Sequence, residues 1–426
     1  MKKIFLLISV ILFIFPVQAQ YTLRLMTYNI KNANGMDDIC NFQRVANVIN
    51  NVSPDVVAIQ EVDSMTRRSE QKYVLGEIAE RTQMHAYFAP AIEFDGGKYG
   101  IGLLTKQVPL RLQTIPLPGR EEARTLILAE FEDYIYCCTH LSLTEEDRMK
   151  SLEIVKSLIA SYKKPLFLAG DMNAEPESDF IKELQKDFQI LSNPEKHTYP
   201  APDPKETIDY IAASKQNATG FAVISARVVN EPMASDHRPI LVELRTAEKA
   251  DKIFRTKPYL QNPVGNGITV MWETTVPSYC WVEYGTDTTR LERARMIVDG
   301  QVVCNNKLHK IRIDGLQPGQ KYYYRVCSQE MLLYQAYKKV FGNTAQSTFS
   351  EFTLPVADTE SFTAIVFNDL HQHTNTFRTL CKQIQDVKYD FVVFNGDCVD
   401  DPVDHEQATT FISELTEGVH GDCIPT

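Results

Sequence analysis

The 426-residue sequence lacks several features that would assign it to a class at once. After residue 15 it has no apolar run near the length of about 20 residues that a membrane span needs, so no transmembrane segment is expected. Its nine cysteines include no CxxC pair and no Cys/His spacing typical of zinc, and the odd number argues against a disulfide framework. In an oxidising compartment one pair could still close, for example Cys280 with Cys304 or Cys327.

Basic residues are also fewer than acidic residues. Lysine and arginine number 44 against 55 aspartates and glutamates, which gives a formal net charge of −11. Dedicated nucleic-acid binders usually carry a basic excess, so the composition disfavours that class, although a local basic groove can exist in an acidic chain. Hydrophobic residues make up 44% and charged residues 23%, which indicates folded domains, and the length indicates about three of them.

The N-terminus has the pattern of a targeting segment. Residues 1–3 (MKK) are basic, Ile4–Phe15 is apolar, and residues 16–19 (PVQA) place small or β-branched residues where a signal peptidase cuts. We expect cleavage after Ala19 and export to the periplasm or the medium. The alternative is a buried N-terminal helix.

Three parts follow the targeting segment. Residues 21–246 alternate apolar strands with helical periodicity, which predicts a mixed α/β domain. After a charged break, residues 253–355 contain short strands separated by turn signals, which predicts a small β-sandwich. Residues 360–426 alternate strand and helix again. The strands predicted in the first part are Leu23–Tyr28, Val56–Gln60, Leu126–Phe131, Ile135–Thr139 and Leu166–Ala169, and the helices are Phe42–Asn50, Tyr73–Thr82, Arg148–Tyr162 and Asp179–Lys186.

Polar or ionisable residues stand at the ends of these strands. Each alone would more often be a cap or a turn former, but five such placements together favour a site at a sheet edge. The residues are Asn29, Glu61, His140, the stretch from Asp171 to Asn173, and Asp236 with His237 just before a strand.

The residue types at these positions suit phosphoryl chemistry. Asn29, Glu61 and Asp236 offer the oxygen ligands that Mg²⁺ or Mn²⁺ prefers. His237 could take a proton from water, with Asp209 as the carboxylate that fixes its tautomer. A further pair, Asn173 and a protonated His140, could stabilise negative charge on a phosphoryl group.

Residues 21–246 resemble the endonuclease/exonuclease/phosphatase superfamily, which includes DNase I-like nucleases, neutral sphingomyelinases and inositol-phosphate phosphatases. The resemblance lies in six blocks in the order of that family: TYNI at 27–30, PDVVAIQEV at 54–62, THL at 139–141, GDMN at 170–173, IDY at 208–210 and SDHRPI at 235–240. It implies a four-layered α/β/β/α sandwich with the site at one edge of the paired sheets.

The resemblance also implies roles. Glu61 would be the main metal ligand, with Asn29 and Asp236 close by. Around the phosphate, Asp171 would orient the attacking water or a second metal, Asn173 would hold the phosphate, Asp209 and His237 would form an acid–histidine pair, and His140 would contact the phosphate.

Two further segments, TRRS at 66–69 and GGKYG at 96–100, are similar to a secreted bacterial subgroup of the superfamily. That subgroup often has asparagine where this chain has Ile101, which concerns the substrate pocket rather than the metal site. Arg67 and Arg124 are candidates for binding the substrate phosphate, with a surface ion pair as the alternative.

The second part resembles the fibronectin type III-like domain that precedes the catalytic domain of purple acid phosphatases. The similar blocks are KPYLQ at 257–261, VMWET at 270–274, VEYGT at 282–286 and LQPGQKYYYRV at 316–326. We interpret Trp272 as sandwich core and assign this part no chemistry.

The third part contains FNDLH at 367–371 and FNGDCVD at 394–400, which resemble the first two motifs of calcineurin-like metallophosphoesterases. In that family Asp369 and His371 would hold one metal and Asp397 would bridge two. The later G-N-H-[DE] motif does not occur before Thr426. We therefore interpret residues 360–426 as an incomplete α/β metallophosphoesterase segment, with a dinuclear metal site only in a longer chain.

Together these observations predict an exported, divalent-metal-dependent hydrolase of phosphoric esters. Water would attack phosphorus with His237, paired to Asp209, as the general base. A small phosphate ester or a lipid head group is favoured over nucleic acid, because the first part is itself acidic. A secreted DNase I-like nuclease is the alternative among enzymes, and a catalytically inert surface-binding module is the alternative of another class.

Overall fold

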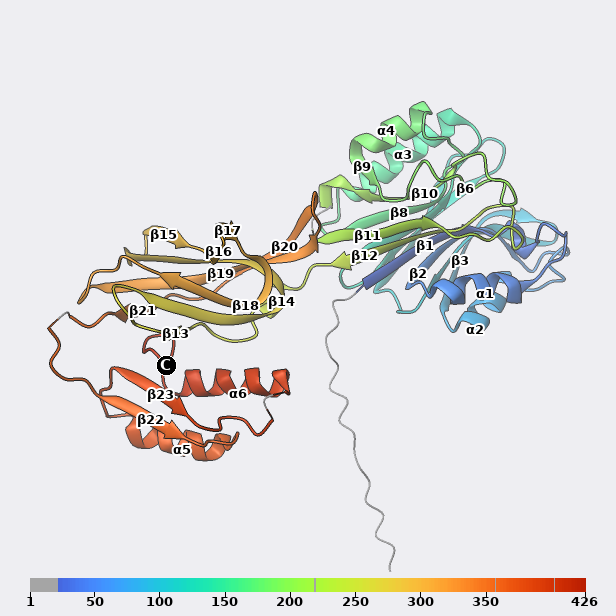
Figure 1. Ribbon diagram of the computed structural model, residues 1–426. Helices are drawn as coiled ribbons and strands as arrows, with labels where there is room; N and C mark the ends of the chain where they lie inside the picture. The colour runs from blue at the N-terminus through green and yellow to red at the C-terminus, as the bar shows by residue number, and fades with distance from the viewer. Residues whose placement is uncertain (1–21, 218–219, 357, 402) are drawn as a thin grey trace, which may run out of the picture.

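The computed structural model describes residues 22–217, 220–356, 358–401 and 403–426. The predicted signal segment lies outside the described residues. Figure 1 shows three bodies in chain order: a layered α/β domain, a β-sandwich and a small α/β segment at the C-terminus. Within the described residues, no helix combines the length and the apolarity that a bilayer-spanning helix requires.

The first domain is a four-layered α/β/β/α sandwich, as predicted. Two six-stranded sheets face each other, and a core that includes Leu25, Tyr136 and Phe167 fills the space between them. In sheet order, the first sheet contains β11 (Phe221–Val228), β12 (Ile240–Thr246), β1 (Thr22–Asn29), β2 (Val56–Ser64), β4 (Gly97–Thr105) and β3 (His85–Phe94), and the second contains β5 (Arg111–Leu117), β6 (Arg124–Glu130), β7 (Ile135–His140), β8 (Leu166–Asp171), β10 (Asp209–Ser214) and β9 (Phe188–Ile190).

Helices cover the outer face of each sheet. Helices α1 (Phe42–Val52) and α2 (Val74–Thr82) pack on the first sheet, and α3 (Glu145–Ile159) and α4 (Asp179–Asp187) pack on the second. The Asn41 side chain caps α1 by accepting from the backbone N–H of Arg44, and Ser178 caps α4 in the same way.

The predicted strands and helices of this domain are present, and their ends differ by a few residues. Strand β2 ends at Ser64 rather than Gln60, and α3 starts at Glu145 rather than Arg148 and ends at Ile159 rather than Tyr162. Its first turn carries Glu145, Glu146 and Asp147, and acidic side chains at a helix N-terminus are stabilised by the helix dipole. The earlier start follows from this charge pattern.

The strand arrangement gathers the polar strand ends at one edge. Strands β1 and β2 are parallel, as are β7 and β8, so Asn29 and His140 end their strands beside Gln60 and Asp171. Strands β10 and β12 run antiparallel to their neighbours, so their first residues lie at this same edge, with Asp209 opposite Asp171.

Gly170 allows this convergence. A Cβ atom at Gly170 would lie 1.9 Å from the carbonyl oxygen of Thr139, and the backbone φ there is +151°. The glycine of the GDMN block therefore lets β8 approach β7 closely next to Asp171.

The second domain is all-β, as predicted. A seven-stranded sheet folds around a core that includes Trp272, whose indole N–H donates to the Ser328 hydroxyl at 3.0 Å. Its strands are β13 (Tyr259–Gln261), β14 (Ile268–Asp287), β15 (Arg290–Ala294), β18 (Cys304–Ile313), β19 (Lys321–Tyr334), β20 (Lys339–Gln346) and β21 (Ser350–Thr353), beside a small hairpin of β16 (Ile297–Val298) and β17 (Gln301–Val302).

No disulfide forms in this domain, because all nine cysteines, each within the described residues, are free. Cys280 instead donates to the Ser328 hydroxyl at 3.1 Å and lies 3.4 Å from His309 Nε2.

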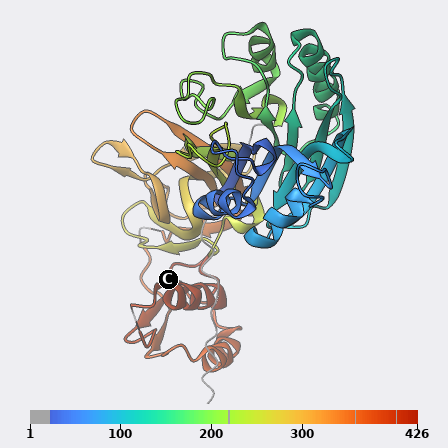
Figure 2. The same ribbon diagram turned by 90° about the vertical axis from the view of Figure 1, so that its right-hand side faces the viewer.

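The C-terminal segment has two parallel strands, β22 (Ala364–Asn368) and β23 (Phe391–Asn395), and two helices, α5 (Thr374–Ile384) and α6 (His405–Gly418). It packs against the second domain (Figure 2). The backbone of Leu260 bonds to Gly421 and Thr426, and the Tyr324 hydroxyl donates to the Asp422 carbonyl at 2.7 Å.

Candidate active site

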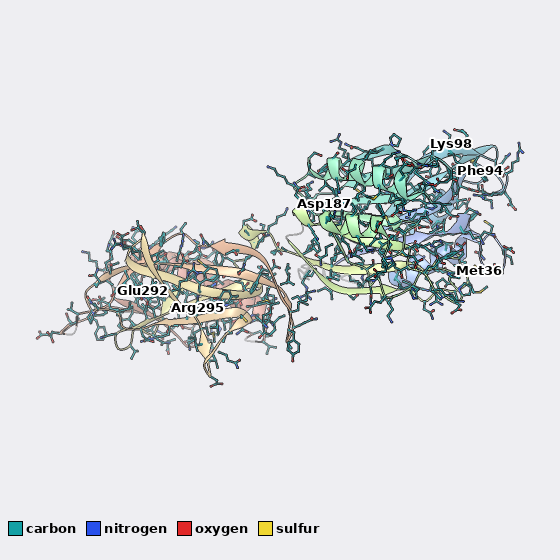
Figure 3. The ribbon with its side chains drawn as sticks, turned by 90° about the horizontal axis from the view of Figure 1, so that it is seen from above. Met36, Phe94, Lys98, Asp187, Glu292 and Arg295 are labelled. Atoms are coloured by element: carbon teal, nitrogen blue, oxygen red, sulfur yellow. The ribbon has the colours of Figure 1, made fainter. Side chains whose placement is uncertain are left out.

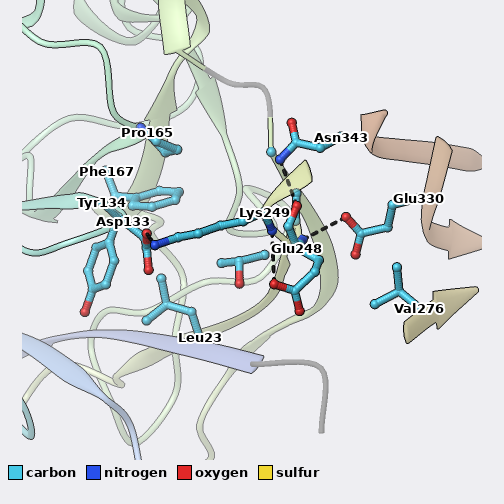
Figure 4. A pocket seen from close by; sticks show the side chains of 13 residues that line it. Leu23, Asp133, Tyr134, Pro165, Phe167, Glu248, Lys249, Val276, Glu330 and Asn343 are labelled. Carbon is cyan, nitrogen blue, oxygen red and sulfur yellow. Dashed lines mark hydrogen bonds and ion pairs between the residues drawn. The ribbon is translucent and has the colours of Figure 1, made fainter. Parts of the chain in front are cut away.

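The predicted site lies at the end of the first domain farthest from the β-sandwich. Figure 3 labels Met36, Phe94 and Lys98 at this end, and they belong to loops and strand ends around the site. The opposite end of the domain borders a pocket of about 360 Å³ shared with the β-sandwich and lined in part by Phe167, Lys249 and Glu330 (Figure 4). None of the predicted site residues of the first domain is among the described residues that line it, so it is not the catalytic site.

Asn29 reaches the site through its amide nitrogen. Its Nδ2 donates to Glu61 Oε1 at 3.0 Å and to Asp171 Oδ2 at 3.1 Å. Its Oδ1 accepts from the backbone N–H of Lys31 at 3.2 Å. In this orientation Asn29 positions two carboxylates, and its role as a metal ligand stays a prediction.

Glu61 projects from an irregularity in β2. Its φ is +58°, and the register between β2 and β4 shifts between Ile59 and Val62. This bulge turns the side chain toward Asn29. Burial raises the pKa of Glu61, the hydrogen bond from Asn29 lowers it, and the charge of Asp236 raises it further. Glu61 is therefore a partly buried carboxylate next to another carboxylate.

Asp209 and His237 form the predicted pair. His237 Nδ1 lies 2.9 Å from Asp209 Oδ2, and the two side chains are buried. The Tyr199 ring packs on the imidazole with its centroid 4.9 Å away. This contact was not predicted, because Tyr199 lies in a long loop without a motif.

Three surrounding carboxylates act on His237. Burial lowers its pKa, but the charge and hydrogen bond of Asp209, together with Asp171 and Asp236, outweigh burial and raise the pKa to about 10. These carboxylates therefore favour the imidazolium form. The role of His237 as a general base stays a prediction.

Burial has the larger effect on His140. It is 7% exposed, and burial lowers its pKa to about 4, although Asp171 raises it. Burial thus favours the uncharged imidazole, which can offer one N–H, and the role of His140 at the phosphate stays a prediction. Its Nε2 lies 3.6 Å from Asp171 Oδ2, so it belongs to the same cluster.

Asp171 is the centre of the cluster. Its Oδ1 accepts from the backbone N–H of Asn173 at 2.9 Å, and its Oδ2 lies 3.8 Å from His237 Nε2. Asn173 uses its side-chain Nδ2 to donate to the Leu141 carbonyl at 2.9 Å, so one of its amide hydrogens is already bonded.

The site has an excess of negative charge. Asp171 and Asp209 are 2% and 1% exposed, and Glu61 and Asp236 lie beside them. Among the described residues, no lysine or arginine forms an ion pair with any of these four carboxylates, and His237 is the one charged partner. Buried carboxylates without a matching cation are costly. Asp209 Oδ1 is also buried without a hydrogen-bond donor.

This donor set fits a hard divalent cation, which prefers carboxylate oxygens. Glu61 and Asp236 form no ion pair with a lysine or arginine of the described residues, and His237 is the cationic side chain that acts on both. A second group comprises Asp171, Asp209 and His237, whose ligand atoms lie within 4.8 Å of one another. In that group His237 Nδ1 is already bonded to Asp209. We therefore regard the group as a charge-paired triad in which Asp171 is the carboxylate that does not bond to His237 Nδ1.

Of the two predicted arginines, Arg124 lies by the site. It is 7% exposed, and its charge is close enough to His140 to lower the pKa of that residue. Arg67 lies at the surface across the turn at Gly96. Its neighbour Arg68 was not predicted. The hydrogen bond to Asp63 raises the pKa of Arg68, and the charge of Glu61 also raises it, so Arg68 interacts with a site carboxylate.

The C-terminal segment brings its three predicted ligands together. The ligand atoms of Asp369, His371 and Asp397 lie within 4.8 Å of one another, and His371 Nδ1 lies 3.0 Å from Asp400. The metal role of this group stays a prediction.

Comparisons with known proteins decide the family of the first domain. The profile of the Endonuclease/Exonuclease/phosphatase family matches residues 26–237. The first domain belongs to this family. The profile described as "Purple acid Phosphatase, N-terminal domain" matches residues 256–342, so the β-sandwich corresponds to that domain. No curated protein matches the chain significantly.

Solved structures with a similar fold include proteins of the endonuclease/exonuclease/phosphatase family. One from Beutenbergia cavernae is 16% identical, with 76% of this chain and 99% of that chain covered and a TM-score of 0.43. A mannosyl-6-phosphatase from Bacteroides thetaiotaomicron is 16% identical (52% and 99% covered, TM-score 0.42). The catalytic domain of human Nocturnin is 21% identical (53% and 95% covered, TM-score 0.42).

Proposed function

We propose that the chain is an exported hydrolase of phosphoric esters whose first domain requires Mg²⁺ or Mn²⁺. Family membership supports phosphoester hydrolysis. The observation that carries the metal requirement is the cluster of four carboxylates against one charged imidazole. Export rests on the pattern of residues 1–19 alone.

Glu61 and Asp236 would hold the cation, with Asn29 fixing the Glu61 carboxylate by its hydrogen bond. When bound, a divalent cation polarises the phosphoryl oxygen and offsets the negative charge of the carboxylates.

Asp171 is the group that orients the attacking water. Its Oδ2 is held by Asn29 Nδ2 and lies within 4 Å of both imidazoles, and its other oxygen is fixed by the Asn173 backbone. A carboxylate in this position can accept the proton of the water as the oxygen attacks phosphorus. In this proposal Asp171 is the base in place of His237.

His237 is the proton donor. Asp209 holds Nδ1–H, so the Nε2–H points toward Asp171 and the reaction centre. As the phosphorus–oxygen bond to the leaving group breaks, Nε2 gives its proton to the leaving oxygen, and the water oxygen takes its place on phosphorus. Arg124 and the uncharged imidazole of His140 are placed to donate hydrogen bonds to phosphoryl oxygens.

One screen of the purified protein with Mg²⁺ or Mn²⁺ can distinguish the possible substrate classes. The substrates are p-nitrophenyl phosphate, bis(p-nitrophenyl) phosphate, inositol phosphates, sphingomyelin and plasmid DNA. We expect turnover of small phosphate esters and none of DNA. Cleavage of plasmid DNA alone would make the protein a nuclease, and no turnover of any substrate would support an inert binding module.

A further inference from the structure

A second group of polar side chains adjoins the catalytic carboxylates. Tyr99 on β4 pairs in register with Asp63 on β2, two residues beyond Glu61. Arg124 begins β6 in the other sheet, and Glu122 precedes it by two residues. We call Arg68, Tyr99, Glu122 and Arg124 the side wall of the site.

Arg68 and Tyr99 form the part of the side wall that belongs to the first sheet. Arg68 donates to both oxygens of Asp63, at 2.6 and 2.7 Å, and stacks over the rings of Phe94 and Tyr99. The two rings lie 5.9 Å apart. A paired and stacked guanidinium of this kind keeps the side chains of the β3–β4 hairpin in place.

Glu122 and Arg124 form the part that belongs to the second sheet. Arg124 Nη1 lies 3.2 Å from Glu122 Oε1, and its Nε is buried without a hydrogen-bond partner. Glu121 braces the segment, because it accepts from the Leu143 backbone at 2.7 Å in the loop that follows His140. Gly119 permits this packing, since a Cβ there would lie 2.0 Å from the Glu122 carbonyl oxygen.

The electrostatics show that the two parts face one another. Burial raises the pKa of Tyr99, the charges of Glu61 and Glu122 raise it further, and Arg124 and Arg68 lower it. Burial also raises the pKa of Glu122, whereas Arg124 and Arg68 lower it. Glu122 is therefore close enough to both arginines to interact with their charges, and Tyr99 interacts with the charges of Glu61, Glu122 and both arginines.

The side wall retains hydrogen-bonding capacity of both kinds. Glu122 offers carboxylate oxygens as acceptors, and the Tyr99 hydroxyl, which forms no hydrogen bond with the described residues, can donate or accept. Arg68 pairs with Asp63, and Arg124 pairs with both Glu121 and Glu122, so the side wall has no unpaired positive charge. A ligand that both donates and accepts without net charge suits such a surface.

We infer that the side wall recognises the leaving group of the substrate, and that this group is a neutral polyhydroxylated alcohol such as a sugar. The inference rests on the proposed phosphoester hydrolysis. Hydroxyls can donate to Glu122 and accept from Tyr99. A second anionic group would be repelled by Glu122, and an apolar chain would leave buried polar groups unpaired, which costs binding energy.

The test compares two phosphomonoesters that differ in the leaving group: glucose 6-phosphate, and p-nitrophenyl phosphate, whose leaving group has no hydroxyls to recognise. The variants are Glu122→Gln and Tyr99→Phe, each checked for an unchanged melting temperature. Glu132→Gln, an exposed glutamate in the β6–β7 turn at the opposite end of the domain, is the matched control.

We expect the ratio of kcat/KM for glucose 6-phosphate to kcat/KM for p-nitrophenyl phosphate to fall about tenfold or more in either variant, since a lost hydrogen bond to a substrate hydroxyl costs on that order. An unchanged ratio in both variants would overturn the inference. If the wild type hydrolyses p-nitrophenyl phosphate but not glucose 6-phosphate, the inference fails and the proposed function stands. If neither ester is hydrolysed with Mg²⁺ or Mn²⁺, the inference fails, and the proposed function fails as well if none of the other esters of the screen is hydrolysed.

Discussion

Glu61→Gln is expected to lower kcat/KM for a phosphate ester by about a hundredfold or more, without unfolding the domain. The amide has the size of the carboxylate and can still accept from Asn29, so the bulge in β2 is preserved. It lacks the negative charge that attracts a hard divalent cation. The measurement is steady-state kinetics over a titration of Mg²⁺ or Mn²⁺.

Glu153→Gln is the control for Glu61→Gln, because Glu153 is a solvent-exposed glutamate of α3. It should keep wild-type activity and cation dependence. Calorimetric titration of Mn²⁺ gives a second readout, in which Glu61→Gln should bind more weakly. Wild-type affinity for Mn²⁺ in Glu61→Gln would remove Glu61 from the cation site.

His237→Ala is expected to reduce the rate by roughly two to four orders of magnitude, as for the loss of a positioned proton donor. Asp209→Asn should cost nearly as much, because Asp209 fixes the imidazole at 2.9 Å and its charge keeps the second proton on His237. The two residues act as one unit, so the double variant should be little worse than His237→Ala.

The measurement is a double-mutant cycle on kcat/KM, with melting temperatures to confirm folding. Independent, additive losses would contradict the pairing. Asp209 is buried, so melting temperatures will show whether Asp209→Asn unfolds the domain. Asp209→Glu distinguishes lost charge from lost folding, because it keeps the charge and should restore part of the rate.

The sequence was sufficient to predict the layered fold and the composition of the edge where the strands end. The reason is partly topological: parallel β7 and β8 end together at His140 and Asp171, and Asn29 at the end of β1 pairs with Gln60, next to Glu61. The bulge within β2 that turns Glu61 toward Asn29 has no such pattern in the sequence.

Protonation states and amide orientation could not be predicted in the same way. They depend on burial and on charges from distant segments: Asp209, Asp171 and Asp236 favour the charged form of His237, and burial favours the neutral form of His140. The direction of the Asn29 amide depends on the backbone of Lys31.

The side wall was missed because no strand-end pattern marks it. Arg68 and Glu122 lie in loops, and they meet Tyr99 and Arg124 only when the two sheets pack face to face. Arg124 was proposed from the resemblance alone, and its buried, partly unpaired guanidinium is a structural observation.

The most direct test of the central claim is release of phosphate from p-nitrophenyl phosphate by protein stripped with EDTA, before and after Mg²⁺ or Mn²⁺ is restored. The excess of buried carboxylates in the first domain predicts almost no turnover without the cation and full recovery with it. Undiminished turnover in excess EDTA would contradict a cation-dependent phosphoesterase.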